Sequence, residues 1–184
     1  MKKLLIAALS ILFLAITQGS VLADYANDRA EIENISNKYM IAMDAGDIET
    51  VMSLWAEDGE MVWVFGEEHG KEAIRKALTP FTIMLADPAG IEAGATSRPR
   101  TRHQIINHVI DVDGDTAHTV AYWFAFTNKT PQGDVQLLYF GHYEVEMVRR
   151  EGRWLFKKRI IYNESKPNRK LFYPGLGETD PLKK

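Results

Sequence analysis

The sequence of 184 residues contains no cysteine. A chain without thiols cannot form disulfides, so packing alone must stabilise its fold. The same absence excludes a thiolate nucleophile as the catalytic group. It also argues against a form that is anchored to a membrane through a lipidated cysteine.

Several motifs that carry chemistry are missing as well. The five histidines show neither the His-x-His nor the His-Glu-x-x-His spacing of metal sites, so we predict no metal ion. There is no Gly-x-Ser-x-Gly nucleophile elbow and no glycine-rich phosphate loop. We therefore expect no cofactor, and any catalysis must use the side chains of the protein itself.

The chain also lacks an excess of charge of either sign, because its formal net charge is only -3. A mildly acidic chain gives no electrostatic reason to expect a nucleic acid or an anionic membrane as a partner. The hydrophobic fraction of 46% and the charged fraction of 26% are typical of a soluble globular protein.

The one long hydrophobic run lies at the N-terminus. Lys2 and Lys3 precede an apolar stretch over residues 4–16, and small residues at 21–23 suit a signal peptidase. The run is shorter than the roughly 20 residues of a membrane span. We predict a signal peptide over residues 1–23 and a periplasmic or secreted mature chain with no membrane contact, the alternative being an uncleaved anchor.

The mature chain opens with helical patterns. Asp28 and Glu31 have the spacing of a capping box, which predicts a helix start. An apolar stripe follows at Ile32, Ile35, Tyr39 and Met43, and Gly46 is suited to end the helix. Asp47 can cap a second helix that carries Val51, Met52, Leu54 and Trp55. A turn is expected at Asp58-Gly59, a short strand over 61–65 and a third helix over 71–78, limited or kinked by Pro80.

Four strands dominate the second half. They are predicted over residues 101–112, 116–128, 135–149 and 154–162, with tight turns at Asp113-Gly114 and Glu151-Gly152. Strands joined by short turns form an antiparallel meander, so the fold class is α+β. Residues 87–100 form a loop, either a lid or a plain connector, and residues 167–184 an irregular tail.

Asp44 is the first candidate for chemistry. It lies near the predicted end of the first helix and beside the apolar stripe, so its carboxylate should point toward the edge of the core. Apolar surroundings and the negative end of the helix dipole both disfavour the ionised carboxylate. Asp44 is therefore a candidate general base, or a partner that orients a histidine; the alternative is a solvated aspartate at a helix end.

His103 is the second candidate. Strict alternation places His103, Ile105, Asn107 and Val109 on one face of the first long strand. A face that mixes a titratable ring, an amide and aliphatic groups is typical of a cavity wall. The alternative is a histidine that is hydrogen-bonded within the sheet.

The whole mature chain resembles a known group. The segments 39–47 (YMIAMDAGD) and 54–59 (LWAEDG) resemble the opening of the SnoaL-like family, within the nuclear transport factor 2-like superfamily. Residues 102–117, 141–143 and 152–159 are similar to its long strands. The resemblance implies a cone-shaped α+β domain over residues 24–166, with N-terminal helices packed on a strongly curved antiparallel sheet that encloses a pocket. It also implies a homodimer or homotrimer.

Within that superfamily the chain looks closest to the branch of scytalone dehydratase and hexachlorocyclohexane dehydrochlorinase. The resemblance implies that Asp44 and His103 form a catalytic dyad and that Arg159 is a further functional residue. Tyr39 stands where the dehydrochlorinase has a catalytic lysine, which is a departure from that enzyme. A tyrosine could still polarise a carbonyl or hydroxyl group.

These observations lead to a hypothesis with two alternatives. We predict an exported enzyme of the dehydratase, lyase or isomerase type, in which the dyad removes a proton from a small, largely apolar substrate. The alternatives are a carrier that binds a small hydrophobic molecule, and a structural subunit. The residues predicted to line the substrate pocket are Trp63, Asn107, Tyr122, Trp123, Tyr139 and Tyr143.

Overall fold

The computed structural model describes residues 2–86 and 100–165, with the backbone alone for residues 2–23. Helices and strands follow one another as α1 (Lys2–Ala45), α2 (Ile48–Ser53), β1 (Trp55–Trp63), β2 (Gly66–His69), α3 (Lys71–Ala86), β3 (Thr101–Asp113), β4 (Thr116–Thr127), β5 (Gln136–Arg150) and β6 (Arg153–Asn163).

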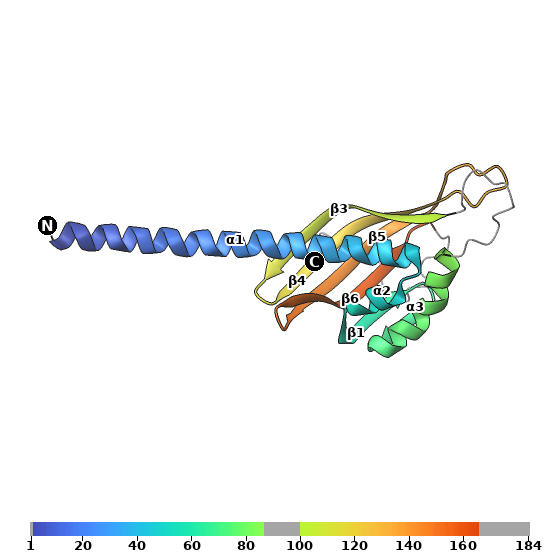
Figure 1. Ribbon diagram of the computed structural model, residues 1–184, viewed down its shortest axis with the longest axis horizontal. Helices are drawn as coiled ribbons and strands as arrows, with labels where there is room; N and C mark the ends of the chain where they lie inside the picture. Colours follow the sequence, from blue (N-terminus) through green and yellow to red (C-terminus); the bar gives the residue numbers. More distant parts are fainter. Residues whose placement is uncertain (1, 87–99, 166–184) are drawn as a thin grey trace.

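The strands form one curved sheet that the helices cover on one side (Figure 1). The strand order is β2-β1-β6-β5-β4-β3, and β3 to β6 pair as the predicted antiparallel meander. β1 joins β6 in parallel, so the complete sheet is mixed. The α+β fold class is confirmed.

The meander follows the sequence prediction closely because its turns are encoded locally. Gly114 and Gly152 adopt positive φ angles of 57° and 74°, and Glu151 adopts 53°. Such angles match the twist of tight hairpins, which favours glycine in these positions. Each strand end therefore falls within two residues of the predicted one.

The predicted helix start at Asp28 is wrong. α1 runs without a break through this point, and Asp28 lies in its interior. The Asp28 carboxylate instead accepts hydrogen bonds from the Trp154 indole at 3.1 Å and from Arg149 at 2.5 Å. Glu31 accepts from the backbone N–H of Trp154 at 3.2 Å. Both acids therefore tie the helix to β5 and β6, a role that local spacing does not distinguish from a cap.

Three other local predictions need correction. Asp58-Gly59 is no turn, because it lies inside β1 at an irregularity in the pairing with β6. Trp55 opens β1 instead of closing the second helix, which ends at Ser53. Pro80 does not end α3, which continues to Ala86 with Pro80 exposed.

The core lies between α1 and the concave face of the sheet. The predicted stripe of Ile32, Ile35, Tyr39 and Met43 is buried as expected. It packs with residues of β1, β5 and β6, among them Phe156, which meets Tyr39 edge to face at 5.4 Å between ring centroids. This packing holds the C-terminal third of α1 over the sheet.

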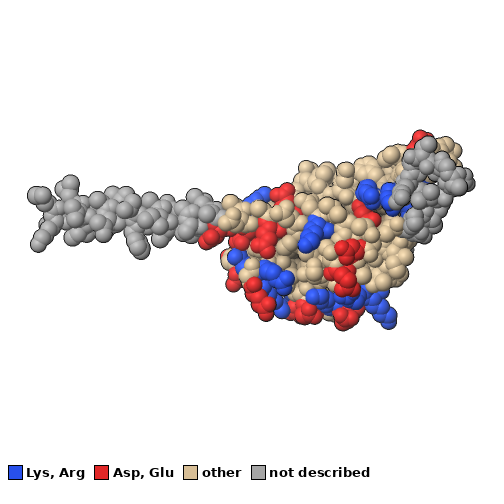
Figure 2. Space-filling model, in the orientation of Figure 1, with Lys and Arg blue, Asp and Glu red and all other residues tan. Residues whose placement is uncertain are grey.

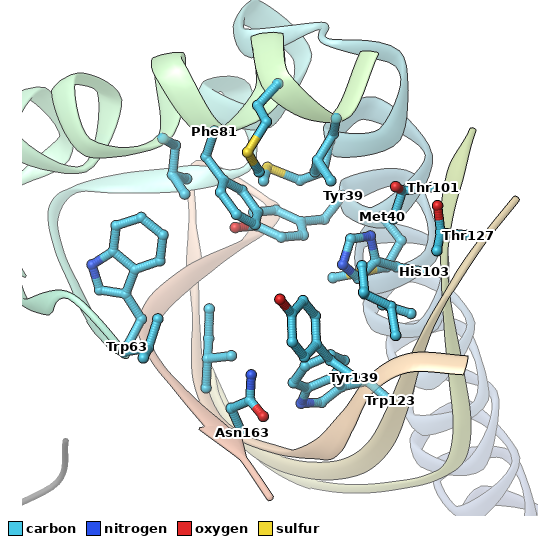
Figure 3. A pocket seen from close by; sticks show the side chains of 18 of the residues that line it. Tyr39, Met40, Trp63, Phe81, Thr101, His103, Trp123, Thr127, Tyr139 and Asn163 are labelled. Atoms are coloured by element: carbon cyan, nitrogen blue, oxygen red, sulfur yellow. The ribbon is translucent and has the colours of Figure 1, made fainter. Parts of the chain in front are cut away.

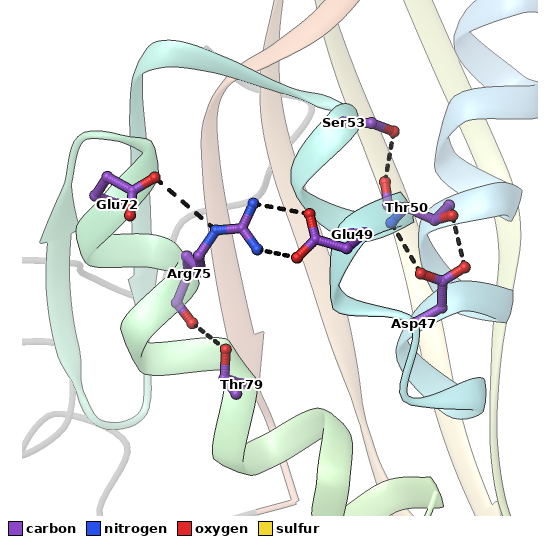
Figure 4. A network of polar contacts seen from close by, with 7 residues as sticks. All are labelled: Asp47, Glu49, Thr50, Ser53, Glu72, Arg75 and Thr79. Carbon is purple, nitrogen blue, oxygen red and sulfur yellow. Dashed lines mark hydrogen bonds and ion pairs between the residues drawn. The ribbon is translucent and has the colours of Figure 1, made fainter.

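Polar contacts fix α2 against α3 (Figure 4). Asp47 caps α2 as predicted, because its carboxylate accepts from the Thr50 N–H at 3.0 Å. Arg75 of α3 binds the Glu49 carboxylate through two nitrogens, at 2.5 and 3.2 Å. The Arg75 contact lowers the pKa of Glu49.

The surface carries both signs of charge. Figure 2 shows Lys and Arg interspersed with Asp and Glu over the face in view. In the part of the chain that the structure describes, no helix is long and apolar enough to span a bilayer. The predicted loop lies, apart from Arg100, outside the described residues, as does the predicted tail over 167–184.

Candidate active site

The end of α1 sets the position of the candidate acid. Gly46 adopts a φ of +76°, as its expected capping role requires, and the backbone N–H of Asp47 donates to Ala42 C=O at 2.9 Å. A Cβ on residue 46 would lie 2.8 Å from Ala86 Cβ. The helix therefore ends at Ala45, and its last turn presents the Asp44 carboxylate to β3.

The structure brings Asp44 and His103 together. Asp44 Oδ1 lies 2.6 Å from His103 Nδ1, and Asp44 Oδ2 accepts the backbone N–H of His103 at 2.8 Å. Asp44 is 6% exposed, so both carboxylate oxygens are largely shielded from solvent. Because Asp44 contacts both the ring and the backbone N–H of His103, the position and orientation of the imidazole are fixed. Its Nε2 makes no hydrogen bond to any residue that the structure describes.

The dyad borders a cavity of about 640 Å³ between the helices and the concave face of the sheet. Figure 3 shows Tyr39, His103 and Tyr139 projecting toward a shared space from α1, β3 and β5. The other residues of the wall are mainly apolar and aromatic. They are Met40, Met43, Trp63, Val64, Phe65, Leu78, Phe81, Met84, Leu85, Thr101, Trp123, Ala125, Thr127, Lys129, Leu138, Tyr143, Ile161 and Asn163.

Tyr39 supplies a hydroxyl group to this wall. Its side chain is buried, and no residue of the described chain forms a hydrogen bond with its hydroxyl. Burial raises the pKa of the phenol, while the positive charge of Arg159 acts to lower it. The hydroxyl is thus neutral at ordinary pH, and it is a buried donor without a partner among the described residues.

Arg159 lies behind the wall and does not line the cavity. It is 1% exposed, and its guanidinium packs on the rings of Tyr143 and Tyr39, at 3.9 and 4.5 Å from the centroids. Its Nε and Nη2 have no hydrogen-bond partner within the described residues. Arg159 therefore does not reach the cavity in this structure, and it contacts the wall through the rings of the two phenols.

Four of the six predicted lining residues belong to the wall, namely Trp63, Trp123, Tyr139 and Tyr143. Asn107 and Tyr122 do not line the cavity, and both are exposed. β3 carries one extra residue between its pairs Ile106–Tyr122 and Val109–Val120, and Asn107 has a φ of 53° there. This bulge exchanges the two faces of the strand, so strict alternation fails beyond His103 and Ile105.

Sequence reasoning missed several polar lining residues. Thr101 and Thr127 face each other across β3 and β4, two positions from the pair His103–Ala125. Asn163 follows Ile161 on the inner face of β6. Strand alternation from Trp123 and Ile161 points to Thr127 and Asn163, although only the fold shows that those positions meet one cavity.

A comparison with models of protein families identifies the family of this chain. The model described as SnoaL-like domain matches residues 24–160, which is most of the sequence. The chain belongs to the SnoaL-like domain family. No protein of curated function matches the sequence significantly.

Solved structures similar to this SnoaL-like protein share its fold. A nuclear transport factor 2-like protein with a cystatin-like fold from Novosphingobium aromaticivorans aligns with a TM-score of 0.65 and 21% identity, over 84% of this chain and 94% of its own. A candidate scytalone dehydratase from the same organism aligns with a TM-score of 0.59 and 22% identity, over 76% of this chain and 85% of its own. A hexachlorocyclohexane dehydrochlorinase of type 2 aligns with a TM-score of 0.59 and 21% identity, over 77% of this chain and 88% of its own.

The described residues of this SnoaL-like chain form no evident metal centre. Within residues 24–86 and 100–165, no group of three or more His, Asp or Glu side chains is arranged to hold a metal ion. What the arrangement offers is an imidazole nitrogen and a phenol hydroxyl at one apolar surface. These groups suit proton transfer to and from a carbon substrate.

Proposed function

We propose that this SnoaL-like protein is a proton-abstracting enzyme of the dehydratase, lyase or isomerase type. Its substrate is a small, largely apolar molecule that binds in the cavity. The observation that carries the proposal is the Asp44–His103 pair at the wall of an apolar cavity, with Nε2 of the ring unengaged. A buried acid with both oxygens committed to one histidine is typical of a site in which the ring must be oriented.

The pair supports His103 as the general base. The 2.6 Å contact supports a bond in which Nδ1 donates its proton to Asp44, and the tautomer with its lone pair on Nε2 is the one that this mechanism uses. Nε2 then takes a proton from an acidified carbon of the substrate, and Asp44 stabilises the imidazolium that forms. A base of this kind contributes about 10²–10⁴-fold to the rate.

Tyr39 is suited to the charge that develops on the substrate. Its unengaged hydroxyl can donate to an enolate oxygen or to a departing hydroxyl group. In a dehydration the C–H electron pair forms the new double bond as the C–O bond breaks. The leaving hydroxide takes the proton held on His103 and departs as water, so the dyad returns to its starting state.

The test is a screen of small cyclic alcohols, enones and halides. We expect His103→Ala to lose turnover by about 10²-fold or more while its circular dichroism and melting curve stay close to wild type. His69→Ala is the matched control, because His69 is exposed and does not line the cavity. Full activity of His103→Ala on a substrate of the wild type would overturn the proposed mechanism.

The second candidate function is a carrier of a small hydrophobic molecule. The volume of about 640 Å³ and the apolar wall favour it, since a carrier needs the cavity but no acid–base pair. Binding that survives His103→Ala, in a protein that turns over no member of the screen, would support this candidate over the enzyme.

We further propose export and self-association. The N-terminal pattern supports a signal peptide over residues 1–23 and a periplasmic or secreted location. Exposed apolar side chains on the outer face of β3, β4 and β5 support a homodimer or homotrimer. They are Ile106, Val109, Tyr122, Leu137 and Phe140.

A further inference from the structure

One residue of the cavity wall carries a permanent charge. Apart from His103, Lys129 is the only lysine, arginine, histidine or carboxylate among the described residues that line the cavity. It follows the end of β4 and is exposed. The rest of the wall gives a ligand mainly apolar contacts, so this ammonium group is distinctive.

The backbone around Lys129 is held in place by neighbouring polar groups. The Lys129 N–H donates to Thr127 Oγ1 at 3.1 Å, and that hydroxyl donates to Arg100 C=O at 3.1 Å. The backbone N–H of Arg100 donates to Asn128 Oδ1 at 2.6 Å, and the backbone N–H of Asn128 donates to Arg100 C=O at 3.2 Å. The lysine therefore extends from a fixed corner at one end of β3 and β4.

The side chain of Lys129 reaches from β4 to the end of α3. Its Nζ donates to the backbone C=O of Met84 at 3.2 Å, and Met84 also lines the cavity. This contact uses one of three ammonium donors. No carboxylate of the described residues lies within 4.0 Å of Nζ, so the charge has no ionic partner there.

The strand register sets the backbone spacing between Lys129 and the dyad. His103 pairs with Ala125, and Thr101 pairs with Thr127, so Lys129 lies four residues along the chain from the level of His103 and two beyond the end of β4. At the strand rise of about 3.3 Å per residue, the backbone spacing is at most roughly 13 Å. A small molecule can span that distance with one end at each group.

We propose that the cavity selects amphipathic anions, in which a carboxylate binds Lys129 and an apolar body extends toward His103. This proposal rests on the proposed function and names its substrate class. The two remaining ammonium donors can form charge-assisted hydrogen bonds to a carboxylate, which a neutral molecule of the same shape cannot accept as strongly. The apolar wall then holds the body of the ligand with its reacting carbon near Nε2.

Binding of two matched probes tests the proposal without knowledge of the substrate. Decanoate and decan-1-ol have the same chain length and differ in their charged end. Titration calorimetry, supported by tryptophan fluorescence, should show wild-type protein binding decanoate about tenfold or more tightly, a preference of the size expected for hydrogen bonds to a charged group. Raising the salt concentration should reduce the preference.

Lys129→Met should bring the preference to within about twofold while leaving decan-1-ol affinity unchanged, because only the charge-assisted bonds are lost. Lys129→Glu should disfavour decanoate. Lys76→Met is the control, since Lys76 is exposed on α3 and does not line the cavity. An unchanged preference in Lys129→Met would overturn the proposal, as would equal or undetectable binding of the two probes by wild type.

A further variant separates this proposal from the proposed function. His103→Ala should keep the preference for decanoate, since Nε2 is not the anion site. Loss of turnover with the preference intact supports both proposals. Full turnover with the preference intact contradicts the mechanism alone, whereas loss of the preference in His103→Ala would assign the anion to the imidazole and contradict the role of Lys129.

Discussion

At the scale of single residues, the site combines groups that the fold holds in unusual surroundings. The Asp44 carboxylate is buried and fully occupied by His103, whereas the Tyr39 hydroxyl is buried and unengaged within the described structure. The Arg159 guanidinium is stacked on aromatic rings without a carboxylate partner among the described residues. Buried polar groups without partners destabilise a protein, so each needs an explanation, such as a catalytic role or a bound molecule that completes its contacts.

Tyr39→Phe tests whether the phenol hydroxyl is kept for function. The change removes a buried hydroxyl that has no partner, so the free energy of unfolding should stay within about 1 kcal/mol of wild type or rise. Turnover should fall about 10–100-fold if the hydroxyl stabilises developing charge. Chemical denaturation and kcat/KM measure the two effects, and unchanged kcat/KM would exclude Tyr39 from the chemistry.

His108 gives a prediction for stability against pH. Partial burial and the nearby charges of Arg159 and Arg29 lower its pKa from 6.5 to about 4, against an opposing effect of Glu33. Between these values the unfolded chain binds the proton more readily than the folded one, so stability falls as pH drops from 6.5 to 4. After allowance for solvent screening, we expect a loss of about 1–2 kcal/mol. His108→Gln should flatten this part of the profile measured by urea denaturation; an unchanged slope would assign the pH effect to other groups.

At the scale of helices and strands, much of the fold could be predicted because its signals are local. Hairpin turns at Gly114 and Gly152 set the four long strands, and Gly46 sets the end of α1 that positions Asp44. The bulge at Asn107 has no comparable signal. It is visible only in the pairing of β3 with β4, and it leaves Asn107 exposed.

For Asp28 and Glu31 a local signal is present, but the prediction drawn from it is wrong. Their spacing matches a cap, but Trp154 and Arg149, more than a hundred residues away, are their partners. Local patterns therefore located Asp44 and His103 correctly on their elements. They could not show that Arg159 lies behind Tyr39, because that depends on how three elements pack.

Asp28→Ala tests the contact of α1 with the sheet. It would leave the buried Trp154 indole and the Arg149 guanidinium without their shared acceptor. We expect a loss of about 1–3 kcal/mol in the free energy of unfolding, measured by urea denaturation. Asp28 lies inside a continuous helix and caps no helix end, so the helical signal in far-ultraviolet circular dichroism should not change. Loss of helical signal would instead support a helix start at Asp28.

Gly141→Ala tests the closest approach of two strands. A Cβ on residue 141 would lie 1.8 Å from Tyr162 C=O, the same oxygen that accepts the Trp123 indole at 3.2 Å. The strands must separate, so we expect a loss of about 3 kcal/mol or more. Gly114→Ala is the control, because it has open space and only a positive φ, which costs about 1 kcal/mol. Equal melting temperatures of the two variants would contradict the close approach.

At the scale of the whole molecule, the chain divides into an N-terminal rod and a domain. Figure 1 shows α1 extending well beyond the sheet before its last third crosses it. Within the part of α1 whose side chains are described, Asp28 is the first buried residue, and residues 24–27 are exposed. Among the described side chains, the contacts that hold α1 in the domain therefore begin close to the predicted start of the mature chain at Asp24.

A chain that begins at Asp24 should thus fold as the full chain does. We expect its melting temperature to differ by no more than about 2 °C, because it keeps the buried residues of α1 from Asp28 onward that pack against the sheet. Expression of the full sequence in a bacterium should give a periplasmic protein whose intact mass corresponds to residues 24–184. Recovery of the uncleaved chain from the membrane fraction would identify residues 1–23 as an anchor, and a large drop in melting temperature would show that the domain itself needs them.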